Sequence, residues 1–160
     1  MAAEIIQGLN SYFTFRIGNE LFAVNIGHVT KILEMSEITR VPNSPKYFLG
    51  IINLFGDVLP VFDGRLKFGF TEVENTRNTC IIVFVFEVDG LVVSSGIIVD
   101  SVEKVLVFEP NQIKPAPTAG KGFNNEYING ITTFNDEFVI ILNLEKIFSE
   151  EEISLIKTIE

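Results

Sequence analysis

The chain has 160 residues, is 47% apolar and carries a formal net charge of −9 at pH 7. This length can bury a sizeable core in one domain of ordinary size or in two small ones. Because an acidic chain without a Lys/Arg cluster repels phosphate groups, we expect no binding to nucleic acid and no anchoring on anionic lipid.

The aromatic and β-branched content predicts an all-β fold. The chain has 15 Phe and no Trp, and residues 81–86 read Ile-Ile-Val-Phe-Val-Phe, which favours strands. The first ten residues lack a basic start, and no apolar run approaches the ~18 residues that span a bilayer. Cys80 is the single cysteine, which excludes an intramolecular disulfide, and we interpret it as a small strand residue. We therefore expect a cytoplasmic protein with no membrane insertion.

The first predicted elements are a hairpin and a short helix. Phe13, Phe15 and Ile17 alternate with polar residues, and Gly18-Asn19 supplies a two-residue turn into a second strand at 21–24. After Asn25 the apolar residues recur at steps of three and four, which predicts a helix over 26–34. Its apolar positions are Ile26, Val29, Ile32 and Leu33.

The stretch 50–68 recurs without a gap 80 residues later, at 130–148. The apolar positions coincide, and so do two polar positions, with Asp57 over Glu137 and Asp63 over Asn143. Both copies predict hairpins, with turns at Phe55-Gly56 and Asn135-Asp136. Two copies are too few for a solenoid. We interpret them as two similar small β-units, although any two hairpins share some features.

A second cycle of the same elements begins at Thr79. The segment 82–93 repeats the first hairpin, with its turn at Asp89-Gly90, and residues 102–106 echo 29–33. The continuous apolar run from Val105 to Phe108 predicts a strand at this place. We therefore expect one domain over 1–160, built from a unit at about 11–75 and a unit at about 79–148.

The last third of the chain contains a long irregular segment and a terminal helix. Residues 109–125 hold three Pro and two Gly and must run over the surface, either as a functional loop or as a plain crossing between strands. Ser149 and Glu152 form a capping box, which predicts a helix over 149–159. Its apolar side should dock on a barrel through Ile153, Ile156 and Ile159.

Motifs that carry chemistry are missing from the sequence. His28 is the only histidine, so neither a His-based metal cluster nor a His-containing triad can form. Asp57, Asp63 and Asp100 follow or flank strands, as turn residues do, and nothing pairs them as acid and base. The glycines stand singly, without a phosphate-binding pattern. We expect no catalysis, no metal and no cofactor, which leaves an interaction module.

Several segments resemble the CheW family of chemotaxis coupling proteins in order and spacing over nearly the whole chain. They are LFAVNIGHVTKILE, ITRVPNSPKYFLGIINLFGDVLPVFDGRLKFG, GIIVDSVEKVL, IKPAP and EYINGITTFNDEFVIILNLEKIFSEEE. The resemblance implies an all-β fold of two five-stranded SH3-like barrels packed together, with short helices. It also implies a non-catalytic adaptor that bridges the cytoplasmic tips of methyl-accepting chemoreceptors and the regulatory domain of the histidine kinase CheA.

The resemblance further implies a receptor-binding groove between the barrels. Position by position, the groove residues are Val29, Lys31, Ile32, Asn53, Leu54, Phe55, Gly56, Ile98, Val99, Asp100 and Val102. Each of them is also explained by plain packing. The runs around Val61, Phe62, Ile141 and Leu142 are too apolar to face water and are expected in the barrel cores.

Two of these positions depart from the family pattern. Phe55 stands where the family has the arginine of NLRG, and Lys31 stands where it has a glutamate. If the two are adjacent, the Lys31 side chain should approach the Phe55 ring within about 6 Å. The alternatives are a divergent CheW-like or CheV-like paralogue that serves another receptor–kinase array, and a small-ligand-binding β-barrel.

Overall fold

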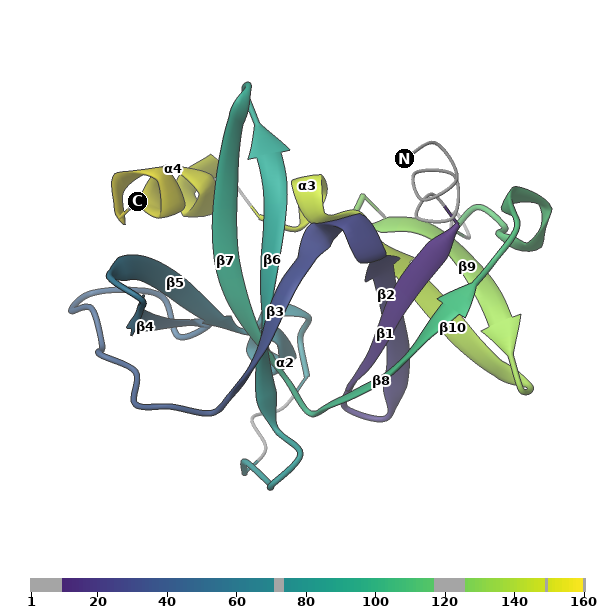
Figure 1. The fold of residues 1–160 in the computed structure, drawn as a ribbon, viewed down its shortest axis with the longest axis horizontal. Coiled ribbons are helices and arrows are strands. Elements are labelled where there is room, and N and C mark those ends of the chain that lie inside the picture. Colours follow the sequence, from purple (N-terminus) through teal and green to yellow (C-terminus); the bar gives the residue numbers. More distant parts are fainter. Residues whose placement is uncertain (1–9, 71–73, 117–125, 149, 160) are drawn as a thin grey trace.

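The computed structural model describes residues 10–70, 74–116, 126–148 and 150–159. In these residues the fold is all-β, with two five-stranded sheets that form two SH3-like barrels (Figure 1). Barrel A has the strand order β8 (Ser101–Val107), β1 (Ser11–Ile17), β2 (Glu20–Asn25), β10 (Glu137–Leu142) and β9 (Ile128–Phe134). Barrel B has the order β3 (Val29–Glu34), β6 (Cys80–Val88), β7 (Leu91–Val99), β5 (Asp57–Asp63) and β4 (Phe48–Leu54).

The 80-residue repeat is confirmed as a pair of equivalent hairpins. β4 and β5 pair antiparallel across Phe55-Gly56, and β9 and β10 do so across Asn135-Asp136. The two polar matches also have a shared cause. Asp63 accepts a hydrogen bond at the start of α2 (Gly64–Lys67), and Asn143 does the same at the start of α3 (Leu144–Ile147). The repeat therefore extends from the hairpin into the short helix that follows it.

The predicted units at 11–75 and 79–148 do not correspond to the two barrels. Barrel A takes β1 and β2 from the first unit and its other three strands from the second. Barrel B takes β3, β4 and β5 from the first unit and β6 and β7 from the second. The cause is an exchange of strands. β3 follows the first hairpin but pairs with β6, and β8 follows the second hairpin but pairs with β1. A repeat in the sequence does not reveal this exchange because it carries no information on pairing partners.

The helix predicted over 26–34 is wrong. A single 3₁₀ turn, η1 (Ile26–His28), is followed by the strand β3. The helix-like spacing has another origin, a β-bulge between Val29 and Lys31. Val29 pairs with Phe84 and Ile32 with Ile82, and both partners belong to one core cluster. The extra residue of the bulge thus places the side chains of Val29 and Ile32 on the same face of β3, although they are three positions apart instead of two.

Three core clusters hold the molecule together. The largest combines residues of both barrels, with Phe15 of β1 and Phe84 of β6 in ring contact at 6.0 Å between centroids. Barrel B has a smaller core around Val61 and barrel A one around Ile141. Val61, Phe62, Ile141 and Leu142 are all buried, as predicted. The large shared core explains why the barrels pack as one body.

The terminal helix α4 (Glu150–Ile159) docks on barrel B, as predicted (Figure 1). Ile156 is buried in the shared core and Ile153 packs against it. Ser149 and the Ile159 side chain lie outside the described residues. The Glu152 carboxylate contacts Lys67 of α2.

The described part of the segment 109–125 is not wholly irregular. It contains the 3₁₀ turn η2 (Pro110–Gln112) and a β-bridge from Lys114 to Ile131. The remainder, 117–125, lies outside the described residues. No helix within the described ranges has both the length and the apolar character needed to cross a bilayer.

Candidate functional site

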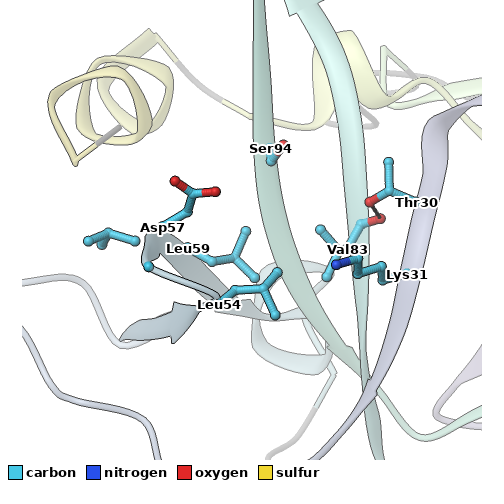
Figure 2. Close-up of a pocket in the computed structure, with 9 residues that line it drawn as sticks. Thr30, Lys31, Leu54, Asp57, Leu59, Val83 and Ser94 are labelled. Atoms are coloured by element: carbon cyan, nitrogen blue, oxygen red, sulfur yellow. Dashed lines mark hydrogen bonds between the residues drawn. The ribbon is translucent and has the colours of Figure 1, made fainter.

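A hollow of about 440 Å³ opens at the mouth of barrel B, between β3 and the tip of the β4–β5 hairpin (Figure 2). We call it the barrel-B mouth. Figure 2 shows Leu54, Asp57 and Leu59 of the hairpin across from Lys31 of β3 and Val83 of β6. The full lining is Thr30, Lys31, Leu54, Gly56, Asp57, Val58, Leu59, Val83 and Ser94.

Lys31 and Phe55 meet at the rim of this hollow. The Lys31 ammonium lies 4.5 Å from the centroid of the Phe55 ring, which confirms the expected approach within about 6 Å. Phe55 is 86% exposed and has a φ of 53°, a region that phenylalanine rarely adopts. Because β3 and β4 are the two edge strands of barrel B, this contact spans the gap between the edges.

An equivalent contact in barrel A was not predicted. Lys104 of β8 lies 4.9 Å from the Phe134 ring of β9, and β8 and β9 are the edge strands of that barrel. The signal was present in the sequence, because VEKVL at 102–106 echoes VTKIL at 29–33 and places Lys104 over Lys31. Each barrel therefore has a Lys–Phe contact between one edge strand and the hairpin that holds the other, with Phe55 in the turn after β4 and Phe134 at the end of β9.

The remaining predicted residues of this hairpin shape the turn. The Gly56 amide donates to Oδ1 of Asn53 at 2.8 Å, and Gly56 has a φ of 91° that suits glycine. Asn53 thus fixes the turn that presents Phe55.

A second hollow, of about 530 Å³, lies between the barrels, and we call it the inter-barrel depression. It brings together Ile32 of β3 and Val102 of β8, two of the predicted groove residues. Ile32 is 46% exposed and Val102 is half-buried. Leu33, Glu34, Met35 and residues 76–80 complete the lining.

The predicted groove is thus divided by the two faces of β3. Lys31 pairs with Val83, whose side chain belongs to the core of barrel B, whereas Ile32 pairs with Ile82 of the shared core. Since cross-strand partners lie on the same face of a sheet, Lys31 and Ile32 point in opposite directions. The groove residues were grouped by the resemblance to the family, and this resemblance does not tell which face of β3 each side chain occupies.

Four predicted groove residues line neither the barrel-B mouth nor the inter-barrel depression and instead pack in the core or form polar contacts beside it. Ile98 and Val99 are 1% and 0% exposed and lie in the cores rather than on a groove. Val29 packs against the shared core. Asp100 accepts a hydrogen bond from the Gly18 amide at 2.6 Å and lies 3.4 Å from Arg65. The apolar run Ile97 to Val99 predicts burial by itself, because every residue in it is apolar.

Several charged groups among the described residues form ion pairs. Hydrogen bonding from Arg16 lowers the pKa of Glu137, and Arg16 also pairs with Glu103 at 2.7 Å. Burial opposes the charge on Arg65, but hydrogen bonds and the charges of Asp63 and Asp100 outweigh it and raise its pKa.

The potential nucleophile and metal ligands offer no reactive arrangement. Burial raises the pKa of the Cys80 thiol, which makes it a poor nucleophile. Nδ1 of His28 lies 2.9 Å from the Val85 carbonyl oxygen. Among the residues that the structure describes, no three His, Cys, Asp or Glu side chains gather in a group that could hold a metal ion.

Comparison with known proteins agrees with this geometry. The family model of the CheW-like domain matches residues 11–152. The chain is 34% identical to chemotaxis protein CheW of Klebsiella aerogenes, over 92% of this chain and 87% of that one. It is 35% identical to a probable chemotaxis protein CheW of Rhizobium etli, over 91% of this chain and 92% of the other.

A solved structure has the same fold. The crystal structure of the scaffolding protein TtCheW from Thermoanaerobacter tengcongensis superposes with a TM-score of 0.77 at 29% sequence identity. The match covers 88% of this chain and 92% of that chain.

Proposed function

The chain belongs to the CheW family, and we propose that it is a non-catalytic cytoplasmic adaptor that couples methyl-accepting chemoreceptors to the histidine kinase CheA. The match to the family over residues 11–152 carries this proposal. The surface is consistent with it, since an adaptor needs apolar contact areas rather than reactive groups. Buried side chains occupy the interiors of both barrels, which disfavours the small-ligand-binding alternative.

We place the receptor contact on both faces of the edge strand β3, at the inter-barrel depression on one face and at the rim of the barrel-B mouth on the other. Ile32 and Val102 supply apolar area in the depression. Lys31, Leu54 and Gly56 line the barrel-B mouth, and Phe55 contacts Lys31 at its rim. Val29, Asn53, Ile98, Val99 and Asp100 hold these residues in place from the core or the turn. Partner binding would cover the exposed 46% of Ile32, which provides roughly half of the 1.5 to 3 kcal/mol that full burial of such a side chain gives.

The test is binding of the purified chain to a receptor-tip fragment and to the CheA regulatory domain from the same cell, measured by calorimetry. Ile32→Asp should weaken receptor binding at least about tenfold, since a carboxylate would be buried against apolar area. Val92→Asp is the matched control, because Val92 is 71% exposed on barrel B and lines neither hollow. It should bind normally.

Two results would contradict the proposal. Failure of the parent chain to bind either partner would remove the adaptor function. Equal weakening by Ile32→Asp and Val92→Asp would remove the depression as the receptor contact.

A further inference from the structure

The strand exchange makes the chain pass between the barrels at two places, and one of these passages is a single residue. β7 of barrel B ends at Val99 and β8 of barrel A begins at Ser101, so Asp100 alone makes the step. The other passage, from β2 to β3, uses the whole 3₁₀ turn η1. The step from β7 to β8, which Figure 1 shows, is therefore the shorter of the two connections between the barrels, and Asp100 is the residue about which they could turn.

Asp100 is held by groups from both barrels. Its amide donates to the carbonyl oxygen of Arg16 in β1, at 2.9 Å. Its Oδ2 accepts the Gly18 amide in the β1–β2 turn of barrel A, at 2.6 Å. Its Oδ1 lies 3.4 Å from Nη1 of Arg65, which belongs to the helix α2 after β5 of barrel B. The side chain thus joins barrel A to the helix attached to barrel B.

Arg65 is fixed on its own side by further contacts. Its side chain is 4% exposed. Its Nε lies 3.1 Å from Oδ1 of Asp63, and its Nη2 donates to Oδ1 of Asn75 at 3.0 Å. A guanidinium stays charged at any physiological pH, so this buried position depends on the two carboxylates beside it. The planar fork of Arg65 is also more directional than a lysine ammonium.

The second copy of the repeat shows that the helical turn itself does not need this network. In α3 the position of Arg65 is taken by Glu145, which is exposed, and Asn143 still caps the turn at 3.2 Å. The position of Gly64 is taken by Leu144. Arg65 is thus a departure from the repeat at the place where the barrels meet.

Gly64 allows this close approach. A Cβ at Gly64 would lie 2.7 Å from the Ile98 carbonyl oxygen and 3.1 Å from Ile17 Cδ1, which belong to different barrels. Contacts under 3.0 Å to a backbone atom are not tolerated without a shift. The first residue of α2 therefore packs closely against both barrels, and the next residue, Arg65, contacts Asp100.

We propose that the Arg65–Asp100 contact fixes the angle between the two barrels and thereby the shape of the inter-barrel depression. The shared core holds the barrels together, but the hydrophobic effect is non-directional, so the core selects their angle less sharply than directional contacts do. Directional ion pairs at the pivot supply that selection. Val102, which lines the depression, follows Asp100 by only two residues. The angle is a property of the isolated protein, and only its consequence for receptor binding rests on the proposed function.

The test measures the distance between the barrels by double electron–electron resonance between two spin labels. In a Cys80→Ala background, one pair places labels at Glu87 of β6 and Asp136 of the β9–β10 turn, which are both exposed and lie in different barrels. A second pair, at Glu87 and Asp57, lies within barrel B. Two variants are compared with the parent chain. Asp100→Asn keeps an oxygen for the Gly18 amide but removes the negative charge, and Arg65→Lys keeps the positive charge but removes the planar guanidinium.

Both variants should shift or broaden the distance between the barrels and leave the distance within barrel B unchanged. Glu137→Gln is the matched control, because it removes an ion pair with Arg16 that lies wholly in barrel A, and it should alter neither distance. Unchanged distances between the barrels would overturn the proposal, and so would equal broadening of both pairs, which indicates general loosening. If Arg65→Lys does not fold, Asp100→Asn alone decides.

Receptor binding provides the second readout. Asp100→Asn should weaken binding of the receptor-tip fragment about tenfold without loss of kinase binding. If the parent chain does not bind the fragment, the proposed function fails, while the distance measurements still decide the role of Arg65 and Asp100.

Discussion

Phe55 and Phe62 have the same side chain in opposite surroundings, and the comparison shows what each phenylalanine contributes. Phe62 is 0% exposed and contacts the rings of Phe48 and Phe148 at 5.1 Å each. Phe55 is almost fully exposed, and its ring contacts the Lys31 ammonium. The first side chain stabilises the fold, and the second belongs to the surface chemistry of the barrel-B mouth.

We expect Phe62→Ala to lower the free energy of unfolding by about 3 to 5 kcal/mol, because it leaves a cavity in the shared core. Phe55→Ala is the control with the same change of atoms and should cost less than about 1 kcal/mol, mostly the Lys31 contact. Urea denaturation followed by circular dichroism measures both. Equal costs would show that exposure does not separate the two roles.

The Lys31–Phe55 pair predicts coupling between the two positions. Phe55→Arg alone should place two cations side by side and weaken receptor binding, whereas Phe55→Arg with Lys31→Glu should restore it through an ion pair. The present contact between the Lys31 ammonium and the Phe55 ring is worth about 0.5 to 1 kcal/mol when exposed. Calorimetric titration of the single and double variants gives the coupling free energy. Equal binding by both variants would show that the positions act independently.

Among the elements, β3 illustrates why the site was predicted only in part. The sequence pattern identified the apolar positions Val29 and Ile32 correctly, but a bulged strand and a helix turn share a spacing of three residues. Pairing with β6 decides between them, and β6 lies about 50 residues further along the chain. Local periodicity contains no such information, so the division into two surfaces was not predictable from 26–34.

The terminal helix α4 depends on a buried ion pair. Lys67 of α2 contacts Glu152, and both side chains are nearly inaccessible. The Lys67 ammonium also lies 5.1 Å from the Tyr47 ring. By contrast, Lys157 of α4 reaches Asp89 at 3.4 Å in a pair that is open to water. The two lysines therefore offer a matched comparison of buried and exposed pairs.

We expect Lys67→Ala to destabilise the protein by about 3 kcal/mol, because it removes a cation from a buried carboxylate. Lys157→Ala should cost no more than about 1 kcal/mol. Hydrogen exchange of the α4 amides should accelerate in the first variant and stay at the parent rate in the second. Loss of α4 protection in both, or in neither, would contradict a specific role for Lys67.

At the scale of the whole molecule, the sequence predicted the class of fold and the repeated unit but not the partition into barrels. The offset of 80 residues located both hairpins and, through Asp63 and Asn143, both capped turns. The resemblance to the CheW family supplied the number of barrels and the adaptor function. The exchange of β3, β4 and β5 with β8, β9 and β10 remained hidden because equivalent strands satisfy the same apolar pattern in either barrel.

This exchange makes a prediction about fragments of the chain. If the repeat units folded separately, residues 1–75 and 79–160 would each form a barrel when produced alone. In the structure neither fragment holds a complete sheet, since barrel A needs β1 and β2 from the first and β8, β9 and β10 from the second. Each fragment alone would also expose its half of the shared core. We therefore expect no cooperative urea transition and no dispersed amide spectrum from either fragment.

An equimolar mixture of the two fragments should recover the spectrum of the intact chain, because every strand pair can then form between them. The intact chain, studied under the same conditions, should unfold in one transition, since its barrels share their largest core and each takes strands from both halves of the chain. A cooperative transition of 1–75 alone would contradict the exchange, because that fragment lacks the β6 partner of β3. Recovery in the mixture but not in the separate fragments would show that the barrels fold only together.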